Sequence, residues 1–354
     1  MDLNKEISIP SLLKIGSGKL VKIGKYLYDR KYMKVSLFFS EGIESVAGAK
    51  LYEGFKKYGI KTARKDYISD INIENIIYTA FKVPADTDAL IGVGGGKSLD
   101  YSKYCAHILK LPFISVPTSL SNDGFCSPGA SLLVEGKRKS VKSSIPYGVV
   151  ADLDIIANAP KESFYSGLGD MVSKVTALWD WKRAFEKKQE EYNDFASLIA
   201  YNSLDALYYA ASEKNFDSKN FYSKLANSLV LSGIAMEIAG SSRPASGSEH
   251  LISHALDHLF FSPRMHGLQV GAAAYLCALI QDNPRACDIK NFLESSGFAD
   301  FVSAGPFNKK EFIEAVKFAP RIKENYYTAL SEPDSFAKAV NFIETDRLLK
   351  KMIN

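Results

Sequence analysis

The strongest constraint on the fold is an alternation of strand-like and helix-like segments over the first 155 residues. Short runs of apolar, β-branched and aromatic residues at 34–39, 89–93 and 112–116 predict strands. The segments 43–58 and 99–109 carry apolar residues at helical spacing. Strands that alternate with helices favour a parallel sheet with helices on both faces. Such a sheet binds its ligands beyond the carboxyl ends of its strands.

The character of the chain changes at Pro160. A hairpin with strands at 130–134 and 140–142, joined by the polar turn 135–138, and a strand at 148–153 complete the first part. Strand signals then nearly cease, and apolar residues at helical spacing predict helices at 171–185, 195–211, 225–238, 248–261, 268–280, 310–317 and 334–343. We therefore predict an α/β domain over residues 1–160 and an all-α domain over residues 161–354.

Composition narrows the class of protein. The 354 residues are 46% hydrophobic and 24% charged, which is typical of a globular protein of two domains. A net charge of +4 gives no reason to expect nucleic acid or an acidic membrane surface as a partner, but suits a small anionic substrate. The four cysteines form no CxxC pair, so we expect a reduced, cytoplasmic setting. We expect neither a signal peptide nor membrane insertion, because the apolar runs are too short.

A glycine-rich loop follows the predicted strand 89–93. Its sequence is Gly92-Val93-Gly94-Gly95-Gly96-Lys97-Ser98, directly before a predicted helix. Glycines let the backbone approach a ligand, and the N–H groups at a helix start hold phosphate oxygens. The loop matches neither GxGxxG nor a Walker sequence, and a tight strand-to-helix turn is the structural alternative. Three consecutive glycines at this place favour phosphate or dinucleotide binding.

A second polar loop, Pro117–Gly124, follows the next predicted strand. It brings hydroxyl groups and one carboxylate, Asp123, to the same edge of the sheet as the glycines. Because polar loops commonly follow strands, this loop alone does not decide between a structural and a functional role.

Four of the five histidines fall between residues 250 and 266. His250 and His254 lie four residues apart and share one face of a predicted helix, and His258 continues the row. His266 follows Ser262-Pro263, which predicts a helix break, and begins the next helix. Unrelated surface or core histidines are the alternative. In a chain this poor in histidine, the pattern favours a metal or proton-transfer site.

A metal held by histidines also needs an anionic ligand. The segment Gly167-Leu168-Gly169-Asp170 offers one, since its glycines predict a turn and Asp170 then begins a long helix. Capping of that helix is the structural alternative. Glu249 and Asp257 compete as ligands, and spacing does not choose among the three carboxylates.

Five segments together resemble the sn-glycerol-1-phosphate dehydrogenases, which belong with the iron-containing alcohol dehydrogenases, glycerol dehydrogenases and dehydroquinate synthases. They are GVGGGKSLDYSK (92–103), PTSLSNDGFCSPGAS (117–131), GVVADLDIIANAP (148–160), SGLGDMVSK (166–174) and SEHLISHALDH…HG (248–267). The resemblance implies a Rossmann-like dinucleotide-binding domain over residues 1–160. It implies a metal- and substrate-binding helical domain of the dehydroquinate synthase type over residues 161–354.

The resemblance also implies the site residues. The metal ligands would be Asp170, His250 and His266, usually with zinc and otherwise with another divalent ion. His254 and Asp123 would face a small phosphorylated substrate, and His254 would relay the proton. NAD or NADP would contact Gly94, Gly95, Gly96, Lys97, Ser98, Asp100, Thr118, Ser119, Ser121 and Ser127. The implied reaction is the reversible reduction of dihydroxyacetone phosphate to sn-glycerol 1-phosphate. A homo-oligomer is compatible with the sequence, which does not fix the oligomeric state.

Two departures from the family pattern leave other functions open. Relatives often have HGEQ where this chain has Leu268 in third place, and Asn122 replaces a family histidine. Another polyol, phosphorylated or phosphonate substrate is therefore an alternative. A dehydroquinate-synthase-like lyase would carry glutamate in place of Asp170, and a non-catalytic nucleotide-binding protein would not need the metal ligands. Glu41 would disfavour the 2′-phosphate of NADP if it points towards the cofactor.

Overall fold

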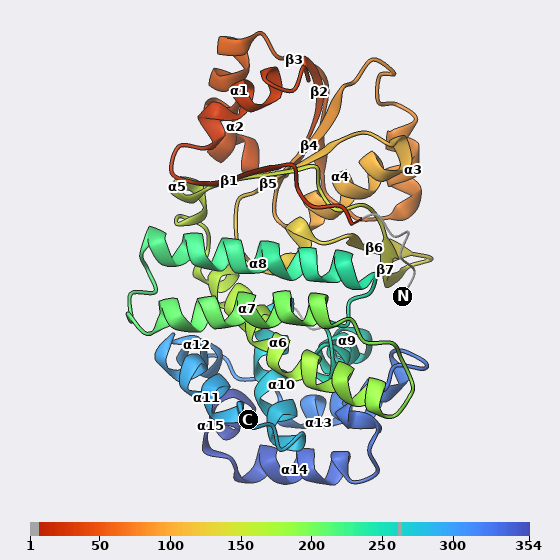
Figure 1. The fold of residues 1–354 in the computed structure, drawn as a ribbon, viewed down its shortest axis with the longest axis vertical. Coiled ribbons are helices and arrows are strands. Elements are labelled where there is room, and N and C mark those ends of the chain that lie inside the picture. Colours follow the sequence, from red (N-terminus) through yellow and green to blue (C-terminus); the bar gives the residue numbers. More distant parts are fainter. Residues whose placement is uncertain (1–6, 261–263) are drawn as a thin grey trace. The chain divides into compact units, whose positions relative to one another are not determined.

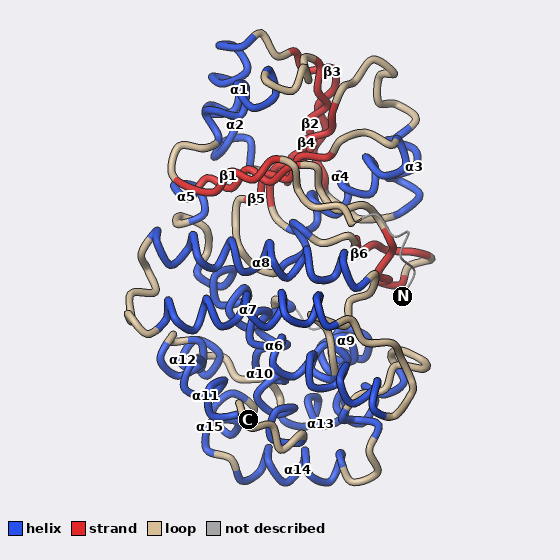
Figure 2. Tube along the Cα trace, in the orientation of Figure 1, coloured by secondary structure: helices blue, strands red, loops and turns tan. Residues whose placement is uncertain are grey.

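The computed structural model describes residues 7–260 and 264–354. The chain divides into two compact units (Figures 1 and 2). The first contains the chain up to Pro160 together with Asp217–Glu237, and the second contains Lys161–Phe216 and Ile238–Asn354. The division of cofactor and metal binding between residues 1–160 and 161–354 stays a prediction.

The first unit is built on a six-stranded parallel sheet, drawn in red in Figure 2. Its strand order is β1-β8-β5-β4-β2-β3. The strands are β1 (Leu12–Gly16), β2 (Lys34–Ser40), β3 (Lys61–Ile68), β4 (Ala89–Gly94), β5 (Phe113–Pro117) and β8 (Gly148–Asp152). Every residue of the inner strands β4, β5 and β8 is buried, as expected of a parallel sheet covered on both faces. The predicted parallel α/β fold is confirmed.

The order of the strands defines where this sheet can bind a ligand. The chain leaves β2 to form β3 at one edge, and then crosses to form β4 on the other side of β2. The connections after β2 and β4 therefore leave the sheet in opposite directions, and ligands bind at such a switch point in open α/β sheets. The loop after β4 is the glycine-rich loop found in the sequence.

Helices and a hairpin complete the first unit. The helices are α1 (Ile23–Tyr28), α2 (Ile43–Tyr58), α3 (Ile73–Ala80), α4 (Gly96–Leu109), α5 (Leu153–Ile156) and most of α8 (Lys219–Ala239), with short 3-10 turns η1 (Leu20–Lys22) and η2 (Asp123–Cys126). The predicted hairpin is formed by β6 (Gly129–Val134) and β7 (Lys137–Lys142). Its turn is shorter than the predicted 135–138, because Glu135 and Gly136 have φ of 53° and 72° and close it as a two-residue turn.

The second unit is helical, as predicted. Its helices are α6 (Lys161–Glu186), α7 (Asp194–Ala211), α9 (Ser248–Phe260), α10 (His266–Ile280), α11 (Ala286–Ser295), α12 (Phe298–Ser303), α13 (Lys309–Phe318), α14 (Ser335–Thr345) and α15 (Arg347–Met352), with η3 (Ala319–Arg321) and η4 (Ala329–Ser331). His266 begins α10, as expected. Phe261 and the predicted break at Ser262-Pro263 lie outside the described residues.

One local prediction is wrong. The segment 167–170 forms no turn, because it lies inside α6. Its glycines serve a close crossing of α6 with α10 instead. A Cβ at Gly169 would lie 1.9 Å from the carbonyl oxygen of Gly267, and a Cβ at Gly267 would lie 1.9 Å from that of Ser166. Only glycine allows this approach, and it places Asp170 beside the first residue of α10, His266.

Among the described residues, no helix is both long enough and apolar enough to cross a membrane.

Candidate active site

The glycine-rich loop is tied to the ends of the neighbouring strands. The Ser40 hydroxyl, at the end of β2, accepts a hydrogen bond from the Gly95 N–H at 3.2 Å and donates to Ser98 Oγ at 2.8 Å. The Thr118 N–H donates to the Gly94 carbonyl oxygen at 3.0 Å. Gly94 has a φ of +144°, and a Cβ there would lie 2.1 Å from Ser40 Oγ. Glycine at position 94 is therefore required by the fold itself.

The next two glycines have a different explanation. Gly95 has a φ of −88°, so it is not left-handed. A Cβ at Gly95 or Gly96 would meet no protein atom within 4 Å. Packing therefore does not require glycine at either position. The absence of side chains leaves the backbone accessible where α4 begins, which is the arrangement that phosphate groups use at helix N-termini. Lys97 is exposed beside this turn, whereas Ser98 is buried beneath it.

A buried lysine that sequence reasoning missed holds two of the predicted cofactor residues. Lys103 is 1% exposed, and its ammonium lies 3.1 Å from Asp100 Oδ1 and 3.4 Å from Ser127 Oγ. It also donates to the Gly124 carbonyl oxygen at 2.7 Å, while Asp100 Oδ2 accepts from the Ser131 N–H at 3.1 Å. Asp100 and Ser127 thus have structural partners of their own. The spacing of three residues between Asp100 and Lys103 on one helix was the available signal.

The second polar loop is fixed at Asp123. This residue opens η2, and its Oδ2 accepts a hydrogen bond from the Ser232 hydroxyl of α8 at 2.6 Å. Asn122, which replaces a family histidine, caps η2 by accepting from the Gly124 N–H at 2.9 Å. Ser119 and Ser121 are half-buried in the same loop. The structure therefore holds the Asp123 carboxylate in a defined place within the first unit.

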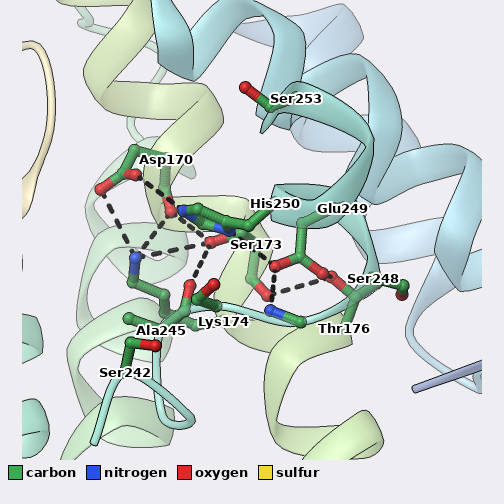
Figure 3. A network of polar contacts seen from close by, with 12 residues as sticks. Asp170, Ser173, Lys174, Thr176, Ser242, Ala245, Ser248, Glu249, His250 and Ser253 are labelled. Atoms are coloured by element: carbon green, nitrogen blue, oxygen red, sulfur yellow. Dashed lines mark hydrogen bonds and ion pairs between the residues drawn. The ribbon is translucent and has the colours of Figure 1, made fainter. Parts of the chain in front are cut away.

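A cluster of three candidate metal ligands lies in the second unit. Asp170 of α6, His250 of α9 and His266 of α10 each offer one ligand atom, and these atoms all lie within 4.8 Å of one another. His250 Nε2 is 3.7 Å from Asp170 Oδ1, and the centres of the His250 and His266 rings are 5.0 Å apart. Figure 3 shows Asp170 and His250 facing each other from separate helices. Two imidazoles and one carboxylate are a ligand set typical of catalytic zinc sites.

The tautomer of His250 is set by Glu249. Its Oε1 lies 2.8 Å from His250 Nδ1 and accepts that proton, so Nε2 is the ring nitrogen directed towards Asp170. The same carboxylate accepts from the Thr176 hydroxyl at 2.7 Å and from the Gly247 N–H at 2.6 Å (Figure 3). Glu249, which the sequence left open as a ligand, therefore orients the candidate ligand His250.

A longer chain of hydrogen bonds orients the imidazole ring of His266. The Ser253 hydroxyl donates to Gln269 Oε1 at 2.5 Å, and Gln269 Nε2 donates to Asp257 Oδ1 at 3.0 Å. Because the one Ser253 proton is used on Gln269, its oxygen accepts from His266 Nδ1, 2.9 Å away. Asp257 thus accepts from Gln269 and is absent from the cluster, so among the three candidate carboxylates the geometry favours Asp170 as the ligand.

The electrostatics of the cluster suit a cation. Burial acts to raise the pKa of Asp170, but buried Lys174, whose ammonium is 3.4 Å from its Oδ2, and His250 lower that pKa below its ordinary value. Burial acts to lower the pKa of His250, but Asp170 and Glu249 raise it to about 9. In the absence of a metal, the anionic surroundings therefore favour a proton on His250. The donor set fits a divalent ion.

His254 lies one turn after His250 on α9 and is exposed. Its ring centre is 5.5 Å from that of His266 and 6.3 Å from that of His250, so three imidazoles gather on one side of the cluster. His258 stacks on Phe318 with ring centres 5.3 Å apart, which gives it a packing role. The histidine row thus contains two ligand candidates, one exposed neighbour and one packing residue.

A parallel α/β unit with a glycine-rich loop at its switch point, followed by a helical unit with an Asp-His-His cluster, resembles the alcohol dehydrogenases of the iron-containing class. The family model described as "Iron-containing alcohol dehydrogenase" matches residues 14–160. The solved structure of glycerol dehydrogenase from Schizosaccharomyces pombe has the same fold, with a TM-score of 0.79 and 18% identity over 99% of this chain and 91% of that one. Within this class, the chain belongs to the glycerol-1-phosphate dehydrogenase family, as its resemblance implied.

Two relatives carry that assignment. The glycerol-1-phosphate dehydrogenase [NAD(P)+] of Metallosphaera sedula is 33% identical, over 92% of this chain and 93% of the relative. The protein of the same name from Staphylothermus marinus is 35% identical, also over 92% of this chain and 93% of the relative.

Proposed function

We propose that this protein catalyses the reversible, NAD(P)H-dependent reduction of dihydroxyacetone phosphate to sn-glycerol 1-phosphate. The relatives that share almost the whole chain bear the name of this activity. The observation that supports it best is the cluster of Asp170, His250 and His266, in which Nδ1 of each imidazole is hydrogen-bonded, to Glu249 and to Ser253 respectively. This arrangement is the one that metal-dependent carbonyl chemistry requires.

The three residues of the cluster would hold Zn²⁺ or another divalent ion. When bound, such an ion polarises a carbonyl oxygen as a Lewis acid, and the nicotinamide cofactor supplies the hydride. Glu249 and Ser253 would keep the two imidazoles in the tautomer that can bind the ion. Lys174 partly offsets the negative charge of Asp170, which leaves the carboxylate ionised in its buried position.

The dinucleotide would bind the first unit at the switch point. The backbone of Gly94, Gly95 and Gly96 and the start of α4 would face the pyrophosphate. Lys97 would add a positive charge, and Thr118, Ser119, Ser121 and Ser127 would line the continuing loop. Ser98 and Asp100 would support the loop and the start of α4 from inside the fold, because both have hydrogen-bond partners there.

We assign proton transfer and substrate orientation to the remaining two predicted residues, His254 and Asp123. His254 is exposed next to the two ligand imidazoles, and an imidazole titrates near neutral pH. We assign it the proton that the product hydroxyl gains. Asp123, fixed by Ser232, would accept a hydrogen bond from the substrate. We also propose a cytoplasmic location, in keeping with four cysteines that are all unpaired thiols.

A spectrophotometric screen tests this function. Oxidation of NADH and of NADPH is followed with dihydroxyacetone phosphate, glyceraldehyde 3-phosphate and dihydroxyacetone, and the glycerol phosphate formed is resolved by chirality. The proposal predicts the highest kcat/KM with dihydroxyacetone phosphate and formation of the sn-1 isomer. A preference for an unphosphorylated carbonyl compound, or formation of the sn-3 isomer, would reject the assignment.

A further inference from the structure

Two cations converge on one aromatic ring in the second unit. The guanidinium carbon of Arg243 lies 3.4 Å from the centre of the Tyr326 ring, and the ammonium of Lys323 lies 3.9 Å from the same centre. The Tyr326 hydroxyl donates to the Ser246 carbonyl oxygen at 2.6 Å, which fixes the ring. The fixed ring therefore holds two positive charges close together.

The two cations differ in how their charge is balanced. Arg243 is 1% exposed and pairs with the Glu190 carboxylate through Nε at 2.5 Å and through a second nitrogen. It also donates to the Tyr327 carbonyl oxygen at 2.8 Å. Lys323 has no carboxylate within ion-pair distance in the described part of the chain, and its polar partner is the Ser242 hydroxyl at 3.4 Å. The charge of Lys323 is therefore offset only in part, by the Glu190 carboxylate, which is already paired with Arg243.

The surroundings of this ammonium group favour an anion. Lys323 is exposed as a whole, but its charged end lies against the Tyr326 ring and Ser242. Burial of that end, together with the charge of Arg243, lowers the pKa of Lys323 from its ordinary value. A bound anion would reverse both effects, because it replaces lost solvation and compensates the charge.

Hydrogen bonds connect this cationic group to the metal-ligand cluster. The Ala245 N–H donates to the Ser242 carbonyl oxygen at 2.9 Å. The Ser173 hydroxyl lies 3.1 Å from the Ala245 carbonyl oxygen and 2.7 Å from that of Asp170. Figure 3 shows Ser242 and Ala245 on one loop, with Ala245 linked to Ser173. Three hydrogen bonds therefore connect Ser242, the partner of Lys323, with the backbone carbonyl oxygen of Asp170.

We propose that Lys323, with the Ser242 hydroxyl, binds the phosphate group of the substrate. This inference rests on the proposed function, and it names the substrate class as a small phosphate monoester whose carbonyl lies at the cluster. Lysine binds phosphate as a point charge, and Ser242 can donate its proton to a phosphate oxygen. Arg243 is occupied by Glu190, so it acts by holding Tyr326 in place rather than by contacting the phosphate.

The test compares phosphorylated and unphosphorylated substrates. In Lys323→Met, KM for dihydroxyacetone phosphate should rise about 10- to 100-fold, the range expected for loss of one charged hydrogen-bonding partner. The kcat/KM for dihydroxyacetone should stay the same, as should the bound metal content. Lys323→Arg should recover most of the affinity, because it restores the charge. Lys317→Met removes an exposed lysine of α13 and is the matched control. It should change neither the KM for dihydroxyacetone phosphate nor the kcat/KM for dihydroxyacetone.

A binding measurement separates failure of this inference from failure of the proposed function. Inorganic phosphate is titrated into the zinc-loaded wild type and Lys323→Met proteins by calorimetry. Weaker phosphate binding in Lys323→Met supports the site even if the wild type does not reduce dihydroxyacetone phosphate, in which case only the function fails. The inference is overturned if the wild type reduces dihydroxyacetone phosphate and Lys323→Met keeps both its KM and its phosphate affinity. An equal loss in Lys317→Met would also overturn it, since the effect would then be one of net charge.

Discussion

His266 Nδ1 lies 2.9 Å from the Ser253 hydroxyl oxygen, and that hydroxyl donates its only proton to Gln269. Ser253 therefore fixes Nδ1 of His266 as a hydrogen-bond donor. The residues that set the tautomer come from α9 and α10, the same helices that carry His250 and His266. The site thus depends on partners of the ligands as much as on the ligands themselves.

The first prediction concerns this serine. Ser253→Ala removes the acceptor of His266 Nδ1–H and frees the imidazole to change tautomer. Zinc affinity should fall about 10- to 100-fold, the usual effect of losing such a partner. Competition with a chromophoric chelator measures it. Ser303→Ala, which removes a hydroxyl bonded within α12 to the Ala299 carbonyl oxygen, is the control and should keep wild-type affinity. Equal affinities in all three proteins would show that Ser253 does not orient the ligand.

The second prediction separates His250 from His254, which lie one turn apart on α9. His250→Ala should lose both metal and activity, because it removes a ligand. His254→Ala should keep the metal and NAD(H) binding but lose about 10²- to 10⁴-fold in kcat, the usual contribution of a general acid or base. Elemental analysis and steady-state kinetics measure the two effects.

His254→Asn sharpens this test, because it keeps a hydrogen bond but cannot transfer a proton near neutral pH. A wild-type rate with an unshifted pH profile in that variant would limit His254 to orienting the substrate. Loss of metal in His254→Ala with retention in His250→Ala would place the ligand set one helical turn away from the one proposed.

The third prediction contrasts two adjacent glycines. Gly94→Ala should destabilise the first unit, because its Cβ would collide with Ser40 Oγ at a φ of +144°. A Cβ at Gly95 would meet no protein atom within 4 Å and the φ there is ordinary, so the fold of Gly95→Val should persist while its cofactor affinity falls. Thermal unfolding and NAD(H) titration distinguish the two variants. Unchanged cofactor affinity in a folded Gly95→Val protein would reduce this turn to a structural element.

The fourth prediction is a pH dependence of metal binding. The folded, metal-free protein holds a proton on His250 up to a pKa of about 9, above the ordinary value of 6.5. The stability that this proton contributes is therefore present below pH 6.5 and is lost as the pH rises towards 9. Zinc must displace the same proton, so its affinity should rise about tenfold per pH unit across that window. Affinities measured at three pH values in one ionic strength check this, and a flat profile would contradict it.

The sequence predicted the centre of the sheet better than its edges. Strands β2, β4, β5 and β8 are buried runs of apolar residues, and the pattern found them all. Strands β1 and β3 were missed because they lie at the two edges of the sheet, where one side has no neighbouring strand. In β3 most residues are exposed or half-buried, so its sequence, KTARKDYI, has no apolar run.

The candidate ligands were visible in the sequence, but their partners were not. Spacing along α9 brought His250 and His254 to one face, yet Asp170 required the resemblance, because α6 lies far from α9 in the chain. The glycines before Asp170 predicted a turn. In the structure they instead allow close contact with Gly267, a residue about a hundred positions away in the chain. The links from Thr176 to Glu249 and from Ser253 to Gln269 likewise depend on how the helices cross.

The most direct test of the account is the rate of NAD(P)H oxidation with dihydroxyacetone phosphate as zinc is removed and restored. Chelator-treated protein is titrated with Zn²⁺, and rate and bound metal are measured on the same samples. The account predicts no significant rate without metal and a linear recovery that ends at one ion per chain, with Asp170→Asn failing to recover at the same zinc concentrations. A metal-free protein that keeps the full rate would contradict it, as would a zinc-loaded protein that leaves dihydroxyacetone phosphate unreduced.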